Sequence, residues 1–166
     1  MAADEVTSSE FRIVRDRALH GVAIERARIG DRSVHAVFLL DGYVQNGGVY
    51  HGTELSDEEF EAGLAGFEWL GLTEMAEVLC EAKRLDRLHE SMSDEELEDD
   101  DSEHVLDERY YGLNRAIDPA IEARWSADPE SFAPITESDR EAYEARQQRL
   151  GRMIAGFEAD GRARNP

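Results

Sequence analysis

The chain has 166 residues, is 41% hydrophobic and carries a formal net charge of −20 at pH 7, which suits one soluble domain with a single core. A surface this acidic repels phosphates, so it argues against direct binding to nucleic acid or to an anionic membrane. The single Cys80 excludes an intramolecular disulfide, and the polar, acidic N-terminus with no long apolar run leads us to expect a cytoplasmic protein with no membrane segment.

The first helix is predicted near the N-terminus. Ser8 or Ser9 is a suitable N-cap for a helix that continues to Val22, because apolar residues recur there at helical spacing. Gly30 and Asp31 are expected to interrupt this pattern.

A second helix is predicted over residues 33–45, and it is expected to end at Asn46-Gly47-Gly48. Asn and Gly readily adopt the left-handed backbone found at helix C-termini. Asn-Gly is also a hairpin signal, but the flanking residues lack the alternation of two strands. We therefore expect Asn46, Gly47 and Gly48 to have a structural role, as a helix end and tight turn.

The clearest helix start lies at Ser56. Ser56 and Glu59 form a capping box, in which each side chain accepts from the backbone of the other residue. An apolar stripe follows from Phe60 until Gly71, and a further helix is predicted over 73–85. The two helices are expected to form an αα-hairpin with a tight turn at Gly71.

The rest of the chain predicts an acidic loop at about 91–103 and then further helices. Residues 94–103 contain eight acids, a run that is typical of a solvated loop. A helix is expected over 105–117, and Asp118 before Pro119 is expected to cap the next one. The last helix is predicted over about 137–160, with a frayed tail after it.

No segment shows the alternation of a strand, so we predict an all-α fold, a single compact multi-helix domain of residues 1–166. The five histidines lack metal-site spacing, and the sequence contains no HExxH, GxSxG or phosphate-binding glycine loop. The run Asp99–Glu103 has His104 where a calcium loop needs glycine. Cys80, read as a small semi-buried residue, has acidic neighbours that raise a thiol pKa. We expect no catalytic residue, no cofactor and no dedicated metal site.

The negative charge is concentrated in one third of the chain. Residues 51–110 contain 21 acidic and 4 basic residues, a net charge of −17, whereas the segments on either side are nearly neutral. A salt-adapted composition would instead spread acids over the whole surface. The clustering favours an electrostatic function for this third.

Within it, two predicted helices carry acids at regular spacing. Carboxylates at i, i+3 or i+4 stand about 5–6 Å apart, comparable to successive phosphates of a DNA strand. A merely solvated face is the other interpretation. The candidate partner-binding residues are Glu54, Asp57, Glu58, Glu61, Glu68, Glu74, Glu77 and Glu81.

Two segments resemble a known family. The sequence LLDGYVQNGGVY at 39–50 is similar to the helix and Asn-Gly-Gly segment of the DNA-mimic-protein family, a bacterial all-α domain. The helices predicted over 60–71 and 73–85 fit its continuation, and LDERYYGL at 106–113 resembles a later helix of that family. The resemblance covers about residues 33–132. It implies a dimeric all-α protein whose acidic face imitates DNA and occupies the DNA-binding surface of a regulator.

We therefore expect a binding protein rather than an enzyme, whose partner is a basic protein, in particular a DNA-binding protein such as a transcriptional regulator. A possible homodimer follows from the resemblance. One alternative is an immunity or antitoxin-like module that neutralises a basic toxin or nuclease. Another is an enzyme with a pocket near Asn46 and Tyr50, for which the sequence shows no catalytic constellation.

Overall fold

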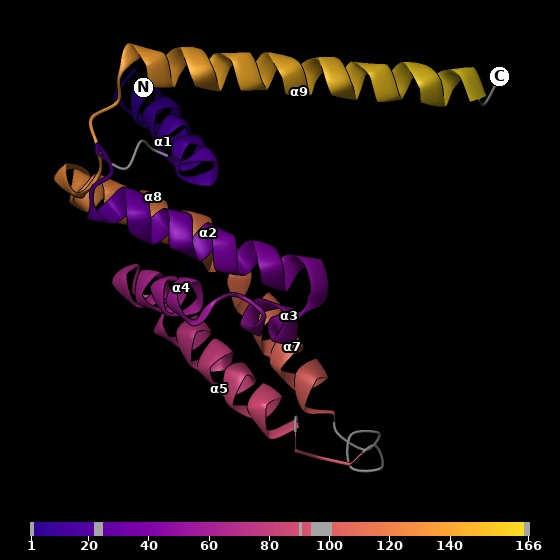
Figure 1. Ribbon diagram of the computed structural model, residues 1–166. Helices are drawn as coiled ribbons and strands as arrows, with labels where there is room; N and C mark the ends of the chain where they lie inside the picture. Colours follow the sequence, from indigo (N-terminus) through magenta and orange to yellow (C-terminus); the bar gives the residue numbers. More distant parts are fainter. Residues whose placement is uncertain (1, 22–24, 90, 94–100, 165–166) are drawn as a thin grey trace. The chain divides into compact units, whose positions relative to one another are not determined.

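The computed structural model describes residues 2–21, 25–89, 91–93 and 101–164, and within these ranges it contains helices and no strand (Figure 1). The prediction of an all-α fold is confirmed. The α-helices are α1 (Ala2–His20), α2 (Ile29–Gly47), α3 (Val49–Thr53), α4 (Asp57–Trp69), α5 (Thr73–His89), α7 (Ser102–Leu113), α8 (Ile117–Ala127) and α9 (Glu137–Arg164). Two short 3-10 helices, η1 (Asn114–Ala116) and η2 (Pro129–Ser131), flank α8.

Residue contacts divide the chain into two compact units, one formed by Met1–Arg17 with Pro134–Pro166 and the other by Ala18–Ala133. The acidic third of the sequence lies entirely in the second unit. That residues 1–166 act as one domain stays a prediction.

Helix α2 is the centre of the larger unit. It packs against α3 and α4, and α5 packs in turn against α3, α4 and α7. Val34, Val37, Leu40 and Val44 are fully buried and recur every three or four residues, so they form one apolar face of α2. Because α2 is covered by α3 and α4, burial of this face stabilises the unit.

Helix α4 approaches α2 unusually closely, at two glycines one turn apart. A Cβ atom at Gly63 would lie 2.5 Å from the Leu40 side chain. One at Gly66 would lie 2.6 Å from the backbone oxygen of Ser33. Both glycines are buried beside Phe67, so the buried face of α4 consists largely of backbone and aromatic rings.

The prediction that Gly30 and Asp31 interrupt the first helix is wrong. Helix α1 ends at His20, before Gly21 in the left-handed region (φ +87°), and Gly30 and Asp31 belong to the first turn of α2. A Cβ atom at Gly30 would lie 2.8 Å from the Phe132 ring. The Asp31 carboxylate accepts hydrogen bonds from the backbone N–H groups of Arg28 (3.0 Å) and Ala133 (2.7 Å). These residues anchor a helix start, and the first helix itself begins at Ala2 rather than near Ser8.

Several other helix boundaries differ from the predicted ones. Helix α7 begins at Ser102, so the end of the predicted acidic loop is helical, whereas residues 94–100 lie outside the described residues. Asp118 does not cap α8, which begins one residue earlier, and it lies in the first turn instead. Helix α9 continues to Arg164, beyond the predicted end at 160, so residues 161–164 are helical and not a frayed tail.

The smaller unit is held by ion pairs between α1 and α9. The Arg17 guanidinium donates to the Pro134 carbonyl (3.3 Å) and to Asp139 (3.4 Å). Two more pairs join these helices, Arg140 with Glu10 (3.1 Å) and Arg146 with Asp16. At the start of α9, Thr136 and Asp139 form a reciprocal cap.

The contact between α4 and α2 predicts a position-specific effect of alanine. Gly66→Ala forces a methyl group against the backbone of α2, and we expect it to lower the free energy of unfolding by about 1–3 kcal/mol. Gly112→Ala in α7 meets no atom within 4 Å and is the matched control, expected to be neutral or stabilising by up to about 1 kcal/mol. Urea unfolding of both variants measures the difference, and equal effects would contradict the close approach.

Candidate functional site

The candidate acidic residues lie on α4 and α5 and in the turn before α4. Seven of the eight are exposed, and Glu81 is half-buried. The exposed residues are Glu54, Asp57, Glu58, Glu61, Glu68, Glu74 and Glu77.

The start of α4 is fixed by the predicted capping box. The backbone N–H of Glu59 donates to Ser56 Oγ (3.3 Å), and the backbone N–H of Ser56 donates to Glu59 Oε2 (3.2 Å). The carboxylates of the first turn also interact favourably with the helix dipole. The geometry explains why three consecutive acids can stand at the first turn of this helix without destabilising it.

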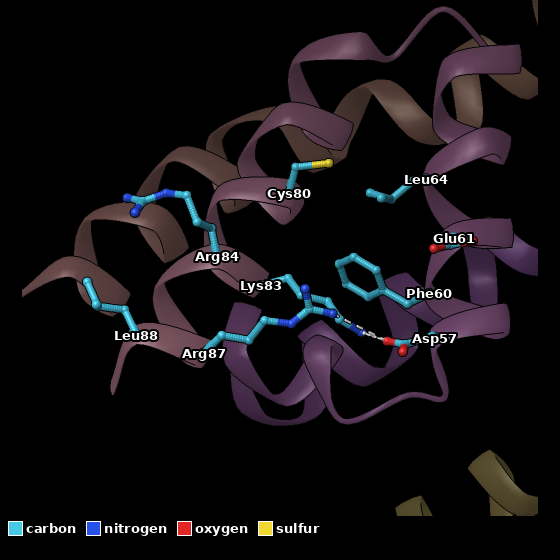
Figure 2. Close-up of a pocket in the computed structure, with 9 residues that line it drawn as sticks. All are labelled: Asp57, Phe60, Glu61, Leu64, Cys80, Lys83, Arg84, Arg87 and Leu88. Carbon is cyan, nitrogen blue, oxygen red and sulfur yellow. Dashed lines mark hydrogen bonds and ion pairs between the residues drawn. The ribbon is translucent and has the colours of Figure 1, made fainter. Parts of the chain in front are cut away.

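Two adjoining grooves run between α4 and α5 and share Cys80 and Arg84. The larger has a volume of about 570 Å³, and Figure 2 shows its lining residues, in which Phe60, Leu64 and Leu88 stand together with charged side chains. The smaller has a volume of about 370 Å³. Asp57 and Glu61 line the larger groove, and Glu68, Glu77 and Glu81 line the smaller. Glu54, Glu58 and Glu74 line neither.

Two of the candidate carboxylates are neutralised by bases of α5. Asp57 accepts a hydrogen bond from Lys83 (2.6 Å) and also lies 3.7 Å from Arg87, contacts that can be followed in Figure 2. Glu81 binds Arg84 through two hydrogen bonds, of 2.7 and 2.9 Å. The hydrogen bond from Lys83 lowers the pKa of Asp57, and the bond from Arg84 lowers the pKa of Glu81. The Glu54 carboxylate also has a partner, because its Oε2 lies 3.1 Å from Nδ1 of His51.

The other five candidates have neither a hydrogen bond nor an ion pair from their side chains within the part of the chain that the structure describes. They are Glu58, Glu61, Glu68, Glu74 and Glu77. Since they are exposed and unpaired, their charge is directed to solvent. We call these five residues the acidic surface.

Cys80 lies between the two grooves and is exposed, not semi-buried as its sequence position indicated. Partial desolvation, followed by the charges of Glu68 and Glu77, raises the pKa of its thiol. A raised pKa keeps the thiol protonated and unreactive at neutral pH.

The Asn46-Gly47-Gly48 segment ends α2. Asn46 and Gly47 are the last two residues of that helix, beyond its predicted end at 45, and Gly48 alone separates it from α3. Gly48 has a φ of +87°, and its N–H donates to the Val44 carbonyl (2.8 Å), which ends α2. The next N–H, of Val49, donates to the Asp107 carboxylate (2.8 Å). A Cβ atom at Gly48 would lie 2.9 Å from this carboxylate. Asp107 therefore caps α3 from α7, a contact that the sequence analysis did not identify.

Two tyrosines of α7 also bind α2. Tyr110 is fully buried and donates to Asp41 (2.9 Å), and Tyr111 donates to the Val44 carbonyl (2.9 Å). Burial and then the Asp41 charge raise the pKa of Tyr110 well above its usual range. The segment 106–113 thus binds the start of α3 through Asp107 and the second half of α2 through the two tyrosine hydroxyls.

The chain was compared with known proteins. The model of the DMP19-like protein family matches residues 27–130, from the start of α2 into η2. The chain belongs to this family. DMP19 proteins are DNA mimics and not a family of enzymes. The match contains every candidate acidic residue, the Asn-Gly-Gly turn and α7, but neither α1 nor α9.

No curated protein and no solved structure was found to match the chain. Within the ranges that the structure describes, every helix is too short or too polar to span a bilayer. The same described residues contain no cluster of three or more His, Cys, Asp or Glu side chains suited to a metal ion.

The tyrosine contacts predict unequal costs for two similar variants. Tyr110→Phe removes a buried donor to a carboxylate, and we expect it to lower the free energy of unfolding by about 1.5–3 kcal/mol. Tyr111→Phe removes a bond to a carbonyl from an exposed ring, with an expected cost of about 0.5–1.5 kcal/mol. Chemical unfolding measures both, and a larger cost for Tyr111→Phe would contradict this assignment.

The raised pKa of Glu103 predicts that the stability of the protein depends on pH. Desolvation and then Asp107 raise the pKa of Glu103, so the folded state holds its proton more tightly than the unfolded chain. This tighter proton binding contributes to the free energy of unfolding at low pH, and the contribution is lost as the pH rises through the pKa of the folded state. Glu103→Gln should therefore stabilise the protein at pH 7 and lose this advantage below the ordinary Glu pKa of about 4.3. Thermal unfolding at several pH values measures it, with Glu122→Gln in α8 as the control.

Proposed function

We propose that this chain is a binding protein whose acidic surface on α4 and α5 takes the place of DNA on a basic, DNA-binding partner. The observation that carries the proposal is the set of five exposed, unpaired carboxylates on two packed helices. Membership of a family of DNA mimics supports the same function.

The spacing of the carboxylates suits this role. Glu58 and Glu61 on α4, and Glu74 and Glu77 on α5, are pairs at i, i+3, a spacing that places their Cβ atoms about 5–6 Å apart on one side of the helix. A cationic side chain that contacts successive phosphates can contact such a pair instead. The pairs stand on helices and not on loops, so little backbone conformational entropy is lost when they bind.

The surroundings of the surface suit long-range attraction. Residues 51–110 carry a net charge of −17, and the bases Lys83, Arg84 and Arg87 are engaged by Asp57 and Glu81. The field around the acidic surface is therefore strongly negative, which speeds encounter with a basic partner and makes binding sensitive to salt. The five side chains need not break an existing ion pair to bind.

The finer features of the function extend this proposal. The partner is a transcriptional regulator or another DNA-binding protein, the site of action is the cytoplasm of a bacterium, and the chain acts as a homodimer. They rest on the resemblance and on the charge distribution.

Two variants of equal net charge, altered at different places, test the proposal. The first variant has Gln at the five positions of the acidic surface. At low salt it should capture basic proteins from a lysate of the source organism at least about tenfold less well than wild type, because the long-range attraction and the ion pairs with the partner are both lost. The wild-type complex should dissociate in moderate salt and in competing duplex DNA. Quantitative mass spectrometry of the captured proteins measures both effects.

The matched control places Gln at five exposed acids outside the acidic surface, Glu122, Glu130, Glu137, Glu141 and Glu144. It changes the net charge by the same amount and should leave capture nearly unchanged. Equal loss in both variants would show that total charge, not this surface, determines binding. Partners that are not basic and whose binding ignores salt would contradict DNA mimicry, and a captured toxin nuclease would favour the immunity module.

A further inference from the structure

The larger groove between α4 and α5 has an apolar lining that is partly open to solvent. Phe60 is almost fully buried, whereas Leu64 is half-buried and Leu88 is 48% exposed. Figure 2 shows these three side chains among the residues that line the groove. The volume of about 570 Å³ falls within the roughly 300–1,000 Å³ that is usual for binding pockets. The groove therefore has room for apolar side chains from another molecule.

The basic residues of the acidic third are gathered at this groove. That third contains four bases, and three of them line the groove. They are Lys83, Arg84 and Arg87. Lys83 lies 4.5 Å from the centre of the Phe60 ring while it binds Asp57, and its side chain is only 15% exposed. The three positive charges equal the three negative charges of Asp57, Glu61 and Glu81, so the charges at the groove sum to zero. An apolar group that enters meets mostly paired charges, which cost less to desolvate than isolated ones.

The acidic surface borders the groove. Glu61 lines it, and Glu58 lies one turn earlier on α4. Glu68 and Glu77 line the adjoining, smaller groove. A partner element whose cations reach these carboxylates therefore passes over the apolar lining. A helix suits this place, because residues at i, i+3 and i+4 put apolar side chains and their cationic neighbours on one side of it. The net charge of −17 in this third repels an acidic occupant and favours a basic one.

We propose that the groove between α4 and α5 is an anchor pocket for the basic partner. It takes apolar side chains of a partner helix, whose flanking cations pair with Glu61 and the other residues of the acidic surface. The proposal deepens the proposed function and rests on it, because one partner makes both contacts. A few side chains buried in pockets near the centre of an interface commonly carry most of its binding energy.

The anchor pocket gives the chain a contact that the phosphates of DNA cannot offer. The phosphate backbone attracts a basic protein through charge, and this attraction falls steeply as the salt concentration rises. Burial of apolar surface involves no charge, so salt does not screen it as it screens an ion pair. The anchor therefore distinguishes a partner with apolar residues on its basic helix from other basic proteins.

The first experiment compares two labelled peptides of about 20 residues, a length at which a chain rich in alanine and lysine forms a helix. Both carry the same lysines, and they differ only at two positions, i and i+4, which are Leu in one peptide and Ala in the other. Fluorescence anisotropy gives the Kd of each peptide for the full chain over a range of salt concentrations. Wild type should bind the Leu peptide at least about tenfold more tightly, by a factor that changes little with salt. Equal affinity for the two peptides would overturn the anchor pocket.

Matched substitutions then locate the contact. Leu88→Gln alters the groove, and Leu19→Gln alters a leucine of similar exposure, 44%, that does not line it. Leu88→Gln should lower the preference for the Leu peptide at least about threefold, whereas Leu19→Gln should leave it unchanged. Cys80→Trp, at an exposed position that lines both grooves, should fill them and remove the preference. Circular dichroism confirms that the variants keep their helices. A preference that survives both groove variants would overturn the proposal.

The variant with Gln at the five positions of the acidic surface separates this proposal from the proposed function. It should weaken the binding of both peptides and flatten the dependence of log Kd on log salt concentration, but keep the preference for Leu. Leu88→Gln should keep the salt dependence and lose the preference. Salt-sensitive binding of both peptides without a preference for Leu would overturn the anchor pocket and leave DNA mimicry standing. Binding that ignores salt and the five substitutions would contradict the proposed function, and with it the anchor pocket.

Discussion

The close approach of α4 to α2 decides where the chain displays its negative charge. At Gly63 and Gly66 no side chain larger than hydrogen fits between the two helices, so the backbone of α4 lies directly against α2. One face of α4 is thereby fixed inward, and its carboxylates on the other face point to solvent. Helix α5 follows through a turn at Gly71, which has a φ of +78°, and it adds a second set of carboxylates at helical spacing. A shift of α4 would move the whole acidic surface.

Acidic residues have two distinct roles in this chain. Asp31, Asp41 and Asp107 accept hydrogen bonds from backbone N–H groups or from a tyrosine, and they hold helices α2, α3 and α7 together. The five residues of the acidic surface make no such contact within the described residues. The net charge of −20 is therefore a poor guide to function by itself. What distinguishes the surface is that its carboxylates are exposed, regular in spacing and unpaired.

Features that depend on neighbours in sequence could be predicted, and features that depend on distant contacts could not. The capping box of Ser56 and Glu59 requires only residues three apart, and the helix end at Gly48 requires only a local left-handed backbone. Gly30 and Asp31 resemble a helix break when only their sequence neighbours are considered, because their role depends on Phe132 and Ala133, about a hundred residues away.

The same limit applies to the candidate site. The pairing of Glu81 with Arg84 follows from helical spacing, whereas Asp57 meets Lys83 only after α4 and α5 have folded together. Eight acidic residues were therefore candidates, but the structure leaves five unpaired. Carboxyl footprinting by mass spectrometry, on the chain alone and bound to its captured partner, tests the central claim most directly. The account predicts that the partner protects Glu58, Glu61, Glu68, Glu74 and Glu77 from labelling and leaves Glu122 and Glu137 unchanged. Unaltered labelling of those five residues in the complex would contradict it.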